Sequence, residues 1–179
     1  TTRVAAQMLL SLQTIVSRNV DPIKRVVLTV GTFETDSVAS NVIAHEVRMK
    51  GTVRTLDSEY RKIAETRVRE ITEGTASAMG AKADITWTPG YPVTMNTPEN
   101  TAFAAEVAKD VAGNVDDNVD PIMPAEDFSY MLEERPGAYI FLGNGDTEMC
   151  HHPRYQFDDE AIPFGSSWYS GMIEARMKL

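Results

Sequence analysis

The stretch Lys50-Gly51-Thr52-Val53-Arg54-Thr55-Leu56-Asp57-Ser58-Glu59-Tyr60 joins two elements of different period. Its first half continues a segment from Val42 that is rich in valine and threonine, as a half-buried strand should be. From Leu56 to Gly80 the apolar positions recur every three or four residues, and Asp57 is a suitable N-cap for a long helix. We therefore predict that a strand leads directly into a helix at this point.

The segments on either side extend this pattern. Apolar positions at helical spacing predict a helix from Val4 to about Asn19, and Arg25 to Phe33 alternates as a strand does. After the long helix, Ala83 to Thr88 predicts a third strand that ends at a Pro-Gly pair. The order helix, strand, strand, helix, strand is that of a split βαββαβ unit without its first strand. We therefore expect further residues ahead of Thr1.

Composition excludes several classes of function. The chain has 179 residues, which is enough for one medium domain or two small ones, and it carries a formal charge of −9 without any basic run. Nucleic acid and anionic membranes are therefore poor partners. A single cysteine rules out an internal disulfide framework, and no apolar run is long enough for a membrane span or shaped like a signal peptide. These features predict a cytoplasmic protein.

The second half of the chain begins after a change of composition between residues 89 and 98, where proline, glycine and asparagine are frequent. Such a change is typical of a crossing between domains. We predict four elements beyond it: a helix from Thr101 to about Ala112, a short helix entered through Pro124–Leu132, a buried strand Gly137–Gly143 and a helix within Asp159–Lys178. Free N–H groups at the start of the short helix could hold an anion.

A histidine pair follows the predicted strand, within Met149-Cys150-His151-His152-Pro153-Arg154-Tyr155-Gln156-Phe157-Asp158-Asp159-Glu160. Loops beyond the carboxyl ends of strands are where α/β enzymes bind ligands, so a metal or substrate site is one interpretation. A surface turn with solvated histidines is the other. Cys150 is more simply a small buried residue or a neighbour of the site than a nucleophile. The acidic loop 114–120 lacks the glycine and glutamate spacing of a calcium-binding EF-hand.

Several motifs together resemble the dinuclear-metal amidohydrolases and peptidases, a family that includes hippurate hydrolases, N-acyl-amino-acid deacylases and glutamate carboxypeptidases. The similarity is greatest to the hippurate hydrolases, and the motifs keep the family's order. They are Leu12-Gln13-Thr14-Ile15-Val16-Ser17-Arg18-Asn19-Val20-Asp21-Pro22, Ser40-Asn41-Val42-Ile43, Lys50-Gly51-Thr52-Val53-Arg54-Thr55-Leu56-Asp57, Pro124-Ala125-Glu126-Asp127-Phe128, and Cys150-His151-His152-Pro153-Arg154-Tyr155 with Phe157.

The resemblance implies an α/β fold in two parts. Residues 1–90 would form a ferredoxin-like α+β lid and dimerisation domain that lacks its first strand. Residues 91–179 would form the C-terminal segment of an α/β metallohydrolase catalytic domain. The complete enzyme would hydrolyse the amide bond of N-acyl amino acids with two divalent metal ions (Zn, Mn, Co or Ni), as a homodimer that associates through the lid.

The resemblance also implies roles for individual residues. His151 matches a late metal ligand of the family and His152 the variable residue after it, whereas the family's other ligands and its catalytic carboxylate have no match in this chain. Asn41 and Arg54 match the positions that hold the substrate carboxylate, and Ala125 lies near a glycine whose backbone N–H meets the same group. Without the resemblance, Asn41 would be the start of a strand and Arg54 a solvated surface charge. Glu126 and Asp127 are adjacent at a helix start, where capping explains them better than acid catalysis.

Three interpretations of function remain open at this stage. The chain can be part of an amidohydrolase, inactive alone because one imidazole cannot hold a catalytic metal. It can instead be a non-catalytic binding or dimerisation module, because an exposed strand edge can pair with its copy. It can also be only a portion of a longer covalent chain. Upstream metal-ligand motifs and the intact mass would distinguish these interpretations.

Overall fold

The computed structural model describes residues 1–177 and divides the chain into two compact units. Unit 1 comprises Thr1–Val93 with Met123–Ala125, and unit 2 comprises Thr94–Ile122 with residues from Glu126 onward. Both helices and strands occur, so the predicted mixed α/β class is confirmed. No helix within the described range is both long and apolar enough to span a lipid bilayer.

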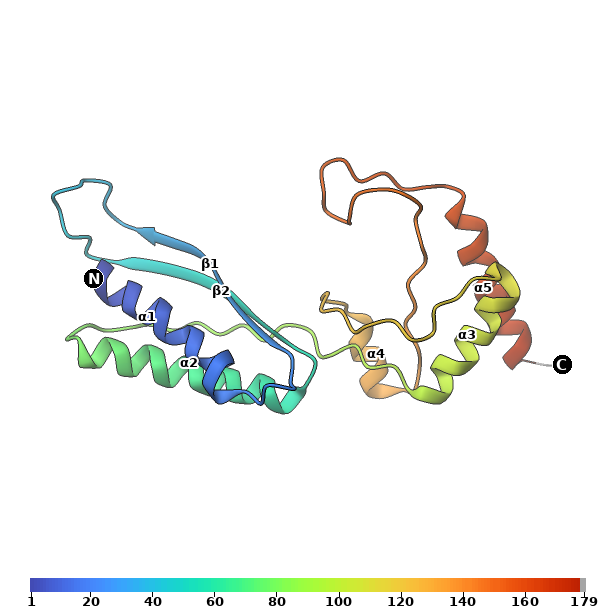
Figure 1. Cartoon of the computed structure of the whole chain (residues 1–179), viewed down its shortest axis with the longest axis horizontal. Helices are drawn as coiled ribbons and strands as arrows, with labels where there is room; N and C mark the ends of the chain where they lie inside the picture. The colour runs from blue at the N-terminus through green and yellow to red at the C-terminus, as the bar shows by residue number, and fades with distance from the viewer. Residues whose placement is uncertain (178–179) are drawn as a thin grey trace. The chain divides into compact units, whose positions relative to one another are not determined.

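Unit 1 places two helices beside a β-hairpin (Figure 1). Helix α1 (Thr2–Thr14) continues into a π-helical turn, η1 (Ile15–Asn19), and α2 (Ser58–Ala78) lies against both. The Asp57 carboxylate caps α2 by accepting from the N–H of Glu59 at 2.9 Å, as predicted. Apolar side chains from the helices and the hairpin form one core; its buried members are Met8, Leu12, Ile15, Val20, Val26, Ala64 and Ala76.

The hairpin consists of β1 (Val26–Thr35) and β2 (Val47–Thr55), paired antiparallel with Val26 opposite Thr55. One face packs on the helices and the other is open to solvent, so alternate residues of β2 are exposed. The register shifts between Val30 and Thr32, which leaves Gly31 as a bulge. Near it the carbonyl of Thr29 comes so close to Gly51 that a Cβ there would collide with it. Close packing against the Thr29 carbonyl therefore requires glycine at position 51 of the Lys50–Thr55 motif.

The predicted second strand begins later than expected, because residues 36–46 form a closed loop. The Asp36 carboxylate accepts hydrogen bonds from the N–H groups of His45 and Glu46, at 3.0 and 3.2 Å. These bonds hold Val42 to Glu46 in the loop, and the ladder starts only at Val47. Both Asn41 and His45 are exposed there.

The predicted strand Ala83–Thr88 is not a strand in the structure. Its burial nevertheless alternates with period two: Ala81, Ala83, Ile85 and Trp87 are half-buried, and the residues between them are exposed. Ala81 and Ala83 pack against the same core as the hairpin. The segment is therefore laid out as a strand is, but no backbone hydrogen bond joins it to β2 within residues 1–177. What it lacks is a ladder partner.

Unit 2 contains α3 (Pro98–Ala112), α4 (Phe128–Glu134) and α5 (Ala161–Arg176). Helix α3 starts three residues earlier than predicted, and Lys178 of the predicted last helix lies outside the described residues. Helices α3 and α5 pack together: the Trp168 indole N–H donates to the carbonyl of Ala104 at 3.1 Å. A Cβ on Gly171 would lie 2.9 Å from Val107, so the two helices approach closely there.

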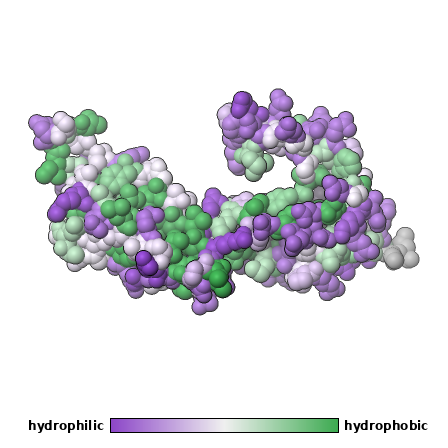
Figure 2. Space-filling model, in the orientation of Figure 1, coloured by the Kyte–Doolittle hydropathy of each residue, from purple (hydrophilic) through white to green (hydrophobic). Residues whose placement is uncertain are grey.

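The predicted buried strand Gly137–Gly143 is also absent, and residues 141–143 are exposed. Backbone groups of this segment form hydrogen bonds with Asn96 and Thr97 instead of with a neighbouring strand. The Asn96 side chain donates to the carbonyl of Tyr139 at 2.9 Å and accepts from its N–H at 2.8 Å. The N–H of Thr97 donates to the carbonyl of Gly137 at 3.0 Å. Apolar surface remains exposed in both units (Figure 2).

Candidate functional site

Arg54 lies on the solvent face of β2, directly opposite Val27 of β1. The alternation of the strand places it there, because its neighbour Thr55 points into the core. Its guanidinium donates from Nη1 to the backbone carbonyl of Met123 at 2.5 Å. A guanidinium has five N–H donors, so one bond to a carbonyl leaves others for a carboxylate. Arg54 is therefore more than an isolated surface charge.

Ala125 belongs to the same unit as Arg54. The segment Met123–Ala125 is grouped with unit 1, although the residues before and after it belong to unit 2. Ala125 is exposed, and its N–H makes no hydrogen bond within the described part of the chain. The Arg54 guanidinium thus contacts the carbonyl of Met123, two residues before the free N–H of Ala125.

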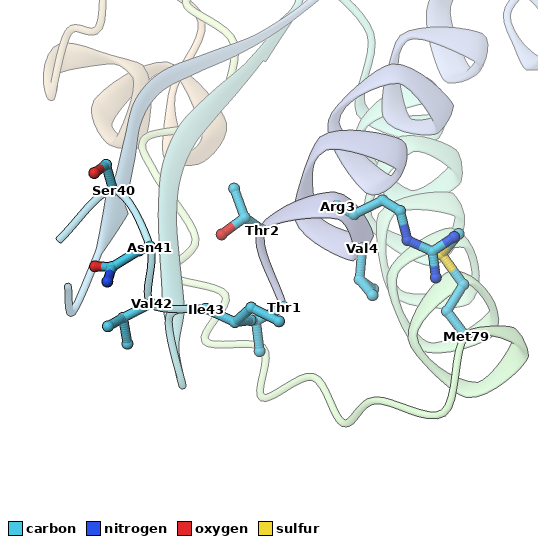
Figure 3. Close-up of a pocket in the computed structure, with 9 residues that line it drawn as sticks. All are labelled: Thr1, Thr2, Arg3, Val4, Ser40, Asn41, Val42, Ile43 and Met79. Atoms are coloured by element: carbon cyan, nitrogen blue, oxygen red, sulfur yellow. The ribbon is translucent and has the colours of Figure 1, made fainter. Parts of the chain in front are cut away.

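Asn41 is not close to Arg54. Asn41 lies in the loop before Val47, whereas Arg54 lies near the other end of β2, and the strand extends for about 23 Å between Val47 and Arg54. Asn41 instead lines a shallow pocket of about 690 Å³ with Thr1–Val4, Ser40–Ile43 and Met79. Figure 3 shows its amide turned away from the Arg3 guanidinium, so the polar groups of this pocket do not converge on one point.

His151 stands in a turn with a backbone φ of +72°. Left-handed geometry is uncommon for residues other than glycine, and histidine is among the residues that tolerate it best. The loop that carries it is held by Asn144, whose side chain donates to the carbonyl of Gln156 and accepts from the N–H of Asp158, at 2.7 and 2.8 Å. The His151 side chain itself is exposed and makes no hydrogen bond within residues 1–177. Its imidazole is therefore free to bind a ligand.

His152 differs from its neighbour. Its Nδ1 accepts a hydrogen bond from the backbone N–H of Arg154 at 3.2 Å, and its own N–H and carbonyl take part in the turn. An imidazole that accepts at Nδ1 carries its proton on Nε2, so neither nitrogen of a neutral His152 is readily available as a metal ligand. The hydrogen bonds thus leave the imidazole of His151 more available to a metal than that of His152, in line with the roles that the resemblance implies.

The described residues do not assemble a metal site. No group of three or more histidine, cysteine, aspartate or glutamate side chains comes together within them. A catalytic metal needs three or more protein ligands, and this chain offers a single imidazole at the predicted position. The donor set of residues 1–177 is therefore too small to hold such an ion alone.

Glu126 follows Ala125, and its carboxylate is engaged by two neighbours. Its carboxylate accepts from the N–H of Phe128 at 3.3 Å and from the hydroxyl of Tyr139 at 3.0 Å. These hydrogen bonds, that of Phe128 first, hold the pKa of Glu126 below its ordinary value. Burial, and then the nearby carboxylate, raise the pKa of Tyr139. One of the N–H groups that could hold an anion at α4 is thus satisfied by the protein's own Glu126 carboxylate, as capping predicts, whereas the side chain of Asp127, the N-cap residue, makes no capping hydrogen bond.

Cys150 corrects another expectation. It is an exposed free thiol and not a small buried residue. His45 is also exposed. The sequence did not indicate the carbonyl of Met123 or the hydroxyl of Tyr139 as partners in this region, because neither contact follows from a local helix or strand pattern: the paired residues are 69 and 13 positions apart.

Residues 7–175 match the family described as Peptidase family M20/M25/M40. The chain is 38% identical to a hippurate hydrolase of Campylobacter jejuni over 97% of its own length, and 39% identical to an N-acetyl-L-cysteine deacetylase of Bacillus subtilis over 88%. Its fold is similar to the crystal structure of the Bacillus subtilis YXEP protein, a dinuclear metal binding peptidase from the M20 family. The TM-score is 0.75, at 28% identity and 95% coverage of this chain.

These relatives are much longer than the chain. It covers 46% of the hippurate hydrolase, 38% of the deacetylase and 44% of the YXEP structure. The match nevertheless runs through nearly all of its own residues, including Arg54, Ala125 and His151. The chain therefore belongs to peptidase family M20/M25/M40.

Proposed function

We propose that this chain forms the C-terminal half of a metal-dependent amidohydrolase that cleaves the amide bond of N-acyl amino acids. Unit 1 is its lid and dimerisation domain, and unit 2 is the end of its catalytic domain. The names of the relatives support the reaction class, since a hippurate hydrolase and an N-acetyl-L-cysteine deacetylase both act on such amides. A cytoplasmic location suits the exposed single thiol, which persists best in a reducing compartment.

The contact of Arg54 with Met123 carries the proposal for the substrate. It brings a guanidinium next to a segment whose last residue, Ala125, has a free N–H. A guanidinium and a backbone donor suit the two oxygens of a planar carboxylate, which is the group that every N-acyl amino acid keeps. The amide to be cleaved lies one carbon away from that carboxylate. Holding it therefore also orients the reacting bond.

Substitution of Arg54 tests this assignment in the complete enzyme. Arg54→Ala should raise the KM for an N-acyl amino acid about tenfold or more, because a charge-assisted pair contributes roughly 1.5–3 kcal/mol. Arg54→Lys should recover part of this loss, since it keeps the charge without the fork. Arg48→Ala is the matched control: Arg48 is exposed on the same face of β2 but pairs with Glu46.

The substrate supplies the second control. When its carboxylate is replaced by a neutral amide, Arg54→Ala should have little effect. An equal rise in KM for both substrates would show that Arg54 supports the structure of the lid and does not hold the carboxylate.

We assign His151 as one ligand of a divalent metal whose other ligands lie outside this chain. Such metals make a bound water nucleophilic and polarise the amide carbonyl. Residues 1–177 supply one exposed imidazole toward that site, held in a left-handed turn. His151→Ala in the complete enzyme should lower the bound metal, measured by elemental analysis, whereas His152→Ala should leave it near the wild-type level. Equal metal content in all three proteins would contradict the assignment. The identity of the ion, whether zinc, manganese, cobalt or nickel, is read from the same measurement.

The separation of Asn41 from Arg54 leads to a proposal about assembly. If both residues hold one carboxylate, they must come from different copies, because the hairpin keeps them apart within a chain. We infer a homodimer through the lid, in which Asn41 of one copy reaches the site of the other. Mixed expression of Asn41→Ala and Arg54→Ala should then restore about a quarter of the wild-type activity, since half of the dimers are mixed and each has one intact site. No restoration would contradict the shared site.

The alternative is a non-catalytic module that uses the free edge of β2 to pair with a copy of itself. It is favoured only by the open hairpin. A complete chain that forms dimers but neither binds metal nor hydrolyses amides would establish it over the enzyme.

A further inference from the structure

His151 lies midway along the loop 144–158, and the side chain of Asn144 joins the two ends of that loop. It donates to the carbonyl of Gln156 at 2.7 Å and accepts from the N–H of Asp158 at 2.8 Å. Asn144 is half-buried, whereas most of the loop is exposed. A side-chain amide that both donates and accepts fixes one backbone segment relative to another. The loop is therefore closed at its base.

Two further contacts join the two sides of the loop. The N–H of Gln156 donates to the hydroxyl of Thr147 at 3.0 Å, and Thr147 is half-buried like Asn144. The guanidinium of Arg154 pairs with the carboxylate of Glu148 at 2.7 Å, but both side chains are exposed. An ion pair in such a position contributes little, because water screens it. Asn144 and Thr147 therefore supply the stronger restraints.

The middle of the loop carries His151 in a conformation that needs such support. Its φ of +72° lies in the left-handed region, where a residue with a side chain is strained and persists only if the surrounding structure holds it. Beside it, the N–H of His152 donates to the carbonyl of Met149 at 3.0 Å, and the N–H of Tyr155 donates to the carbonyl of His152 at 2.9 Å. These short-range turns start from the two sides of the loop. The direction of the His151 imidazole therefore depends on the restraint at the base.

We propose that Asn144 and Thr147 are positioning residues for His151, which hold the loop 144–158 in the conformation that presents the exposed imidazole to a divalent metal ion. The inference rests on the proposed function, because it explains how the ligand that this chain supplies is kept in place. Both residues act through the backbone of the loop and not as ligands. All the residues involved belong to unit 2. A ligand held in advance loses less conformational freedom on binding, so loss of its support should weaken metal binding.

The test measures metal binding by the complete enzyme, prepared free of metal and titrated with Zn²⁺. Asn144→Ala removes both bonds at the base, and Thr147→Val keeps the shape of the side chain and removes its hydroxyl. Each should raise the Kd for the ion that His151 binds about tenfold, because contacts that support a metal ligand typically change the affinity by about 10- to 100-fold. Thr147→Ser keeps the hydroxyl and should restore the wild-type Kd. Asp146→Asn is the matched control, because its side chain lies in the same loop, is exposed and makes no hydrogen bond within the described residues.

A double variant shows whether Asn144 acts through His151. If it does, Asn144→Ala combined with His151→Ala should have the same Kd as His151→Ala alone, because the imidazole to be positioned is already missing. Fully additive effects of the two substitutions would overturn the inference, since Asn144 would then influence the metal site by another route.

The remaining outcomes separate the inference from the function on which it rests. If His151→Ala binds the ion as tightly as the wild type, His151 is not a ligand and the proposed metal site is refuted. If His151→Ala weakens binding while Asn144→Ala and Thr147→Val keep the wild-type Kd, only the positioning role is overturned. A lower melting temperature of these two variants without a change in Kd overturns it as well, because a purely structural hydrogen bond would act in this way.

Discussion

The side chain of Asn96 takes the place of a neighbouring strand beside Tyr139, and its removal should destabilise unit 2. Asn96 is half-buried and makes two hydrogen bonds, one to each backbone polar group of Tyr139. Asn96→Ala removes both at once. A typical hydrogen bond contributes about 1 kcal/mol net, and a buried group left without a partner costs about 1–3 kcal/mol. Because Tyr139 is only half-buried, water replaces part of the loss, and we expect a total of about 2 kcal/mol.

The assay should report on unit 2 alone. Trp168 lies in α5 and donates to Ala104 of α3, whereas the other tryptophan, Trp87, lies in unit 1. In a Trp87→Phe background, fluorescence during urea unfolding therefore follows Trp168. A loss of about 2 kcal/mol corresponds to a melting temperature lower by about 10 °C for a unit of this size.

Two further variants decide the interpretation. Asn118→Ala is the matched control, because the Asn118 side chain is exposed and makes no hydrogen bond within the described residues. Asn96→Asp keeps an acceptor for the Tyr139 N–H but loses the donor to its carbonyl, so its stability should fall between those of wild type and Asn96→Ala. If Asn96→Ala and Asn118→Ala differ by less than about 0.5 kcal/mol, Asn96 does not hold the segment and the reasoning is wrong.

Three more predictions concern the two units. Gly74→Ala in α2 should stabilise unit 1 by about 0.5–1 kcal/mol, because a Cβ there meets nothing within 4 Å. Gly171→Val should instead destabilise unit 2 by about 1–3 kcal/mol, because its side chain would clash with Val107. Thermal unfolding measures both changes. The hydrogen bond from Lys24 lowers the pKa of Asp57 below 3.8, so this group stabilises the fold above that pH and loses its effect as the pH falls through the lower folded value. Asp57→Asn should therefore flatten the acid side of the stability profile, and Asp84→Asn, at an exposed position, should not. Amides of Ala83–Thr88 should exchange with solvent much faster than those that pair β1 with β2, as mass spectrometry or NMR would show, since no ladder protects them.

The helices were the most predictable elements because their signals are local. The carboxylate of Asp57 caps a helix that begins at the next residue, and apolar spacing placed the buried face of α1 correctly at Met8 and Leu12. Strands depend on partners elsewhere in the chain. Ala83–Thr88 and Gly137–Gly143 have the composition of strands, but no ladder forms at either within the described residues. Local pattern therefore indicated strand composition and could not predict the pairing.

The candidate site was predictable to a similar degree. The sequence motif indicated Arg54, and strand alternation explains why it faces solvent. Its bond to Met123 joins residues 69 positions apart, which no local pattern reveals. Asn41 was expected beside Arg54 because the resemblance assigns both to the substrate carboxylate, but the loop closed by Asp36 carries it beyond the far end of the hairpin. Residues of one motif set can thus be separated by the length of a strand.

The unpaired segment of unit 1 has a direction that follows from its connections. Helix α2 connects β2 to Ala83–Thr88 and runs opposite to both, so the chain reverses twice and these two segments run the same way (Figure 1). Both rest on one core, and each leaves backbone groups unpaired along its length within residues 1–177. One extended segment that runs antiparallel to both could satisfy both edges at once, which is the arrangement of a split βαββαβ unit. A strand edge left open in this way invites association, so its completion would also protect the hairpin from unwanted pairing.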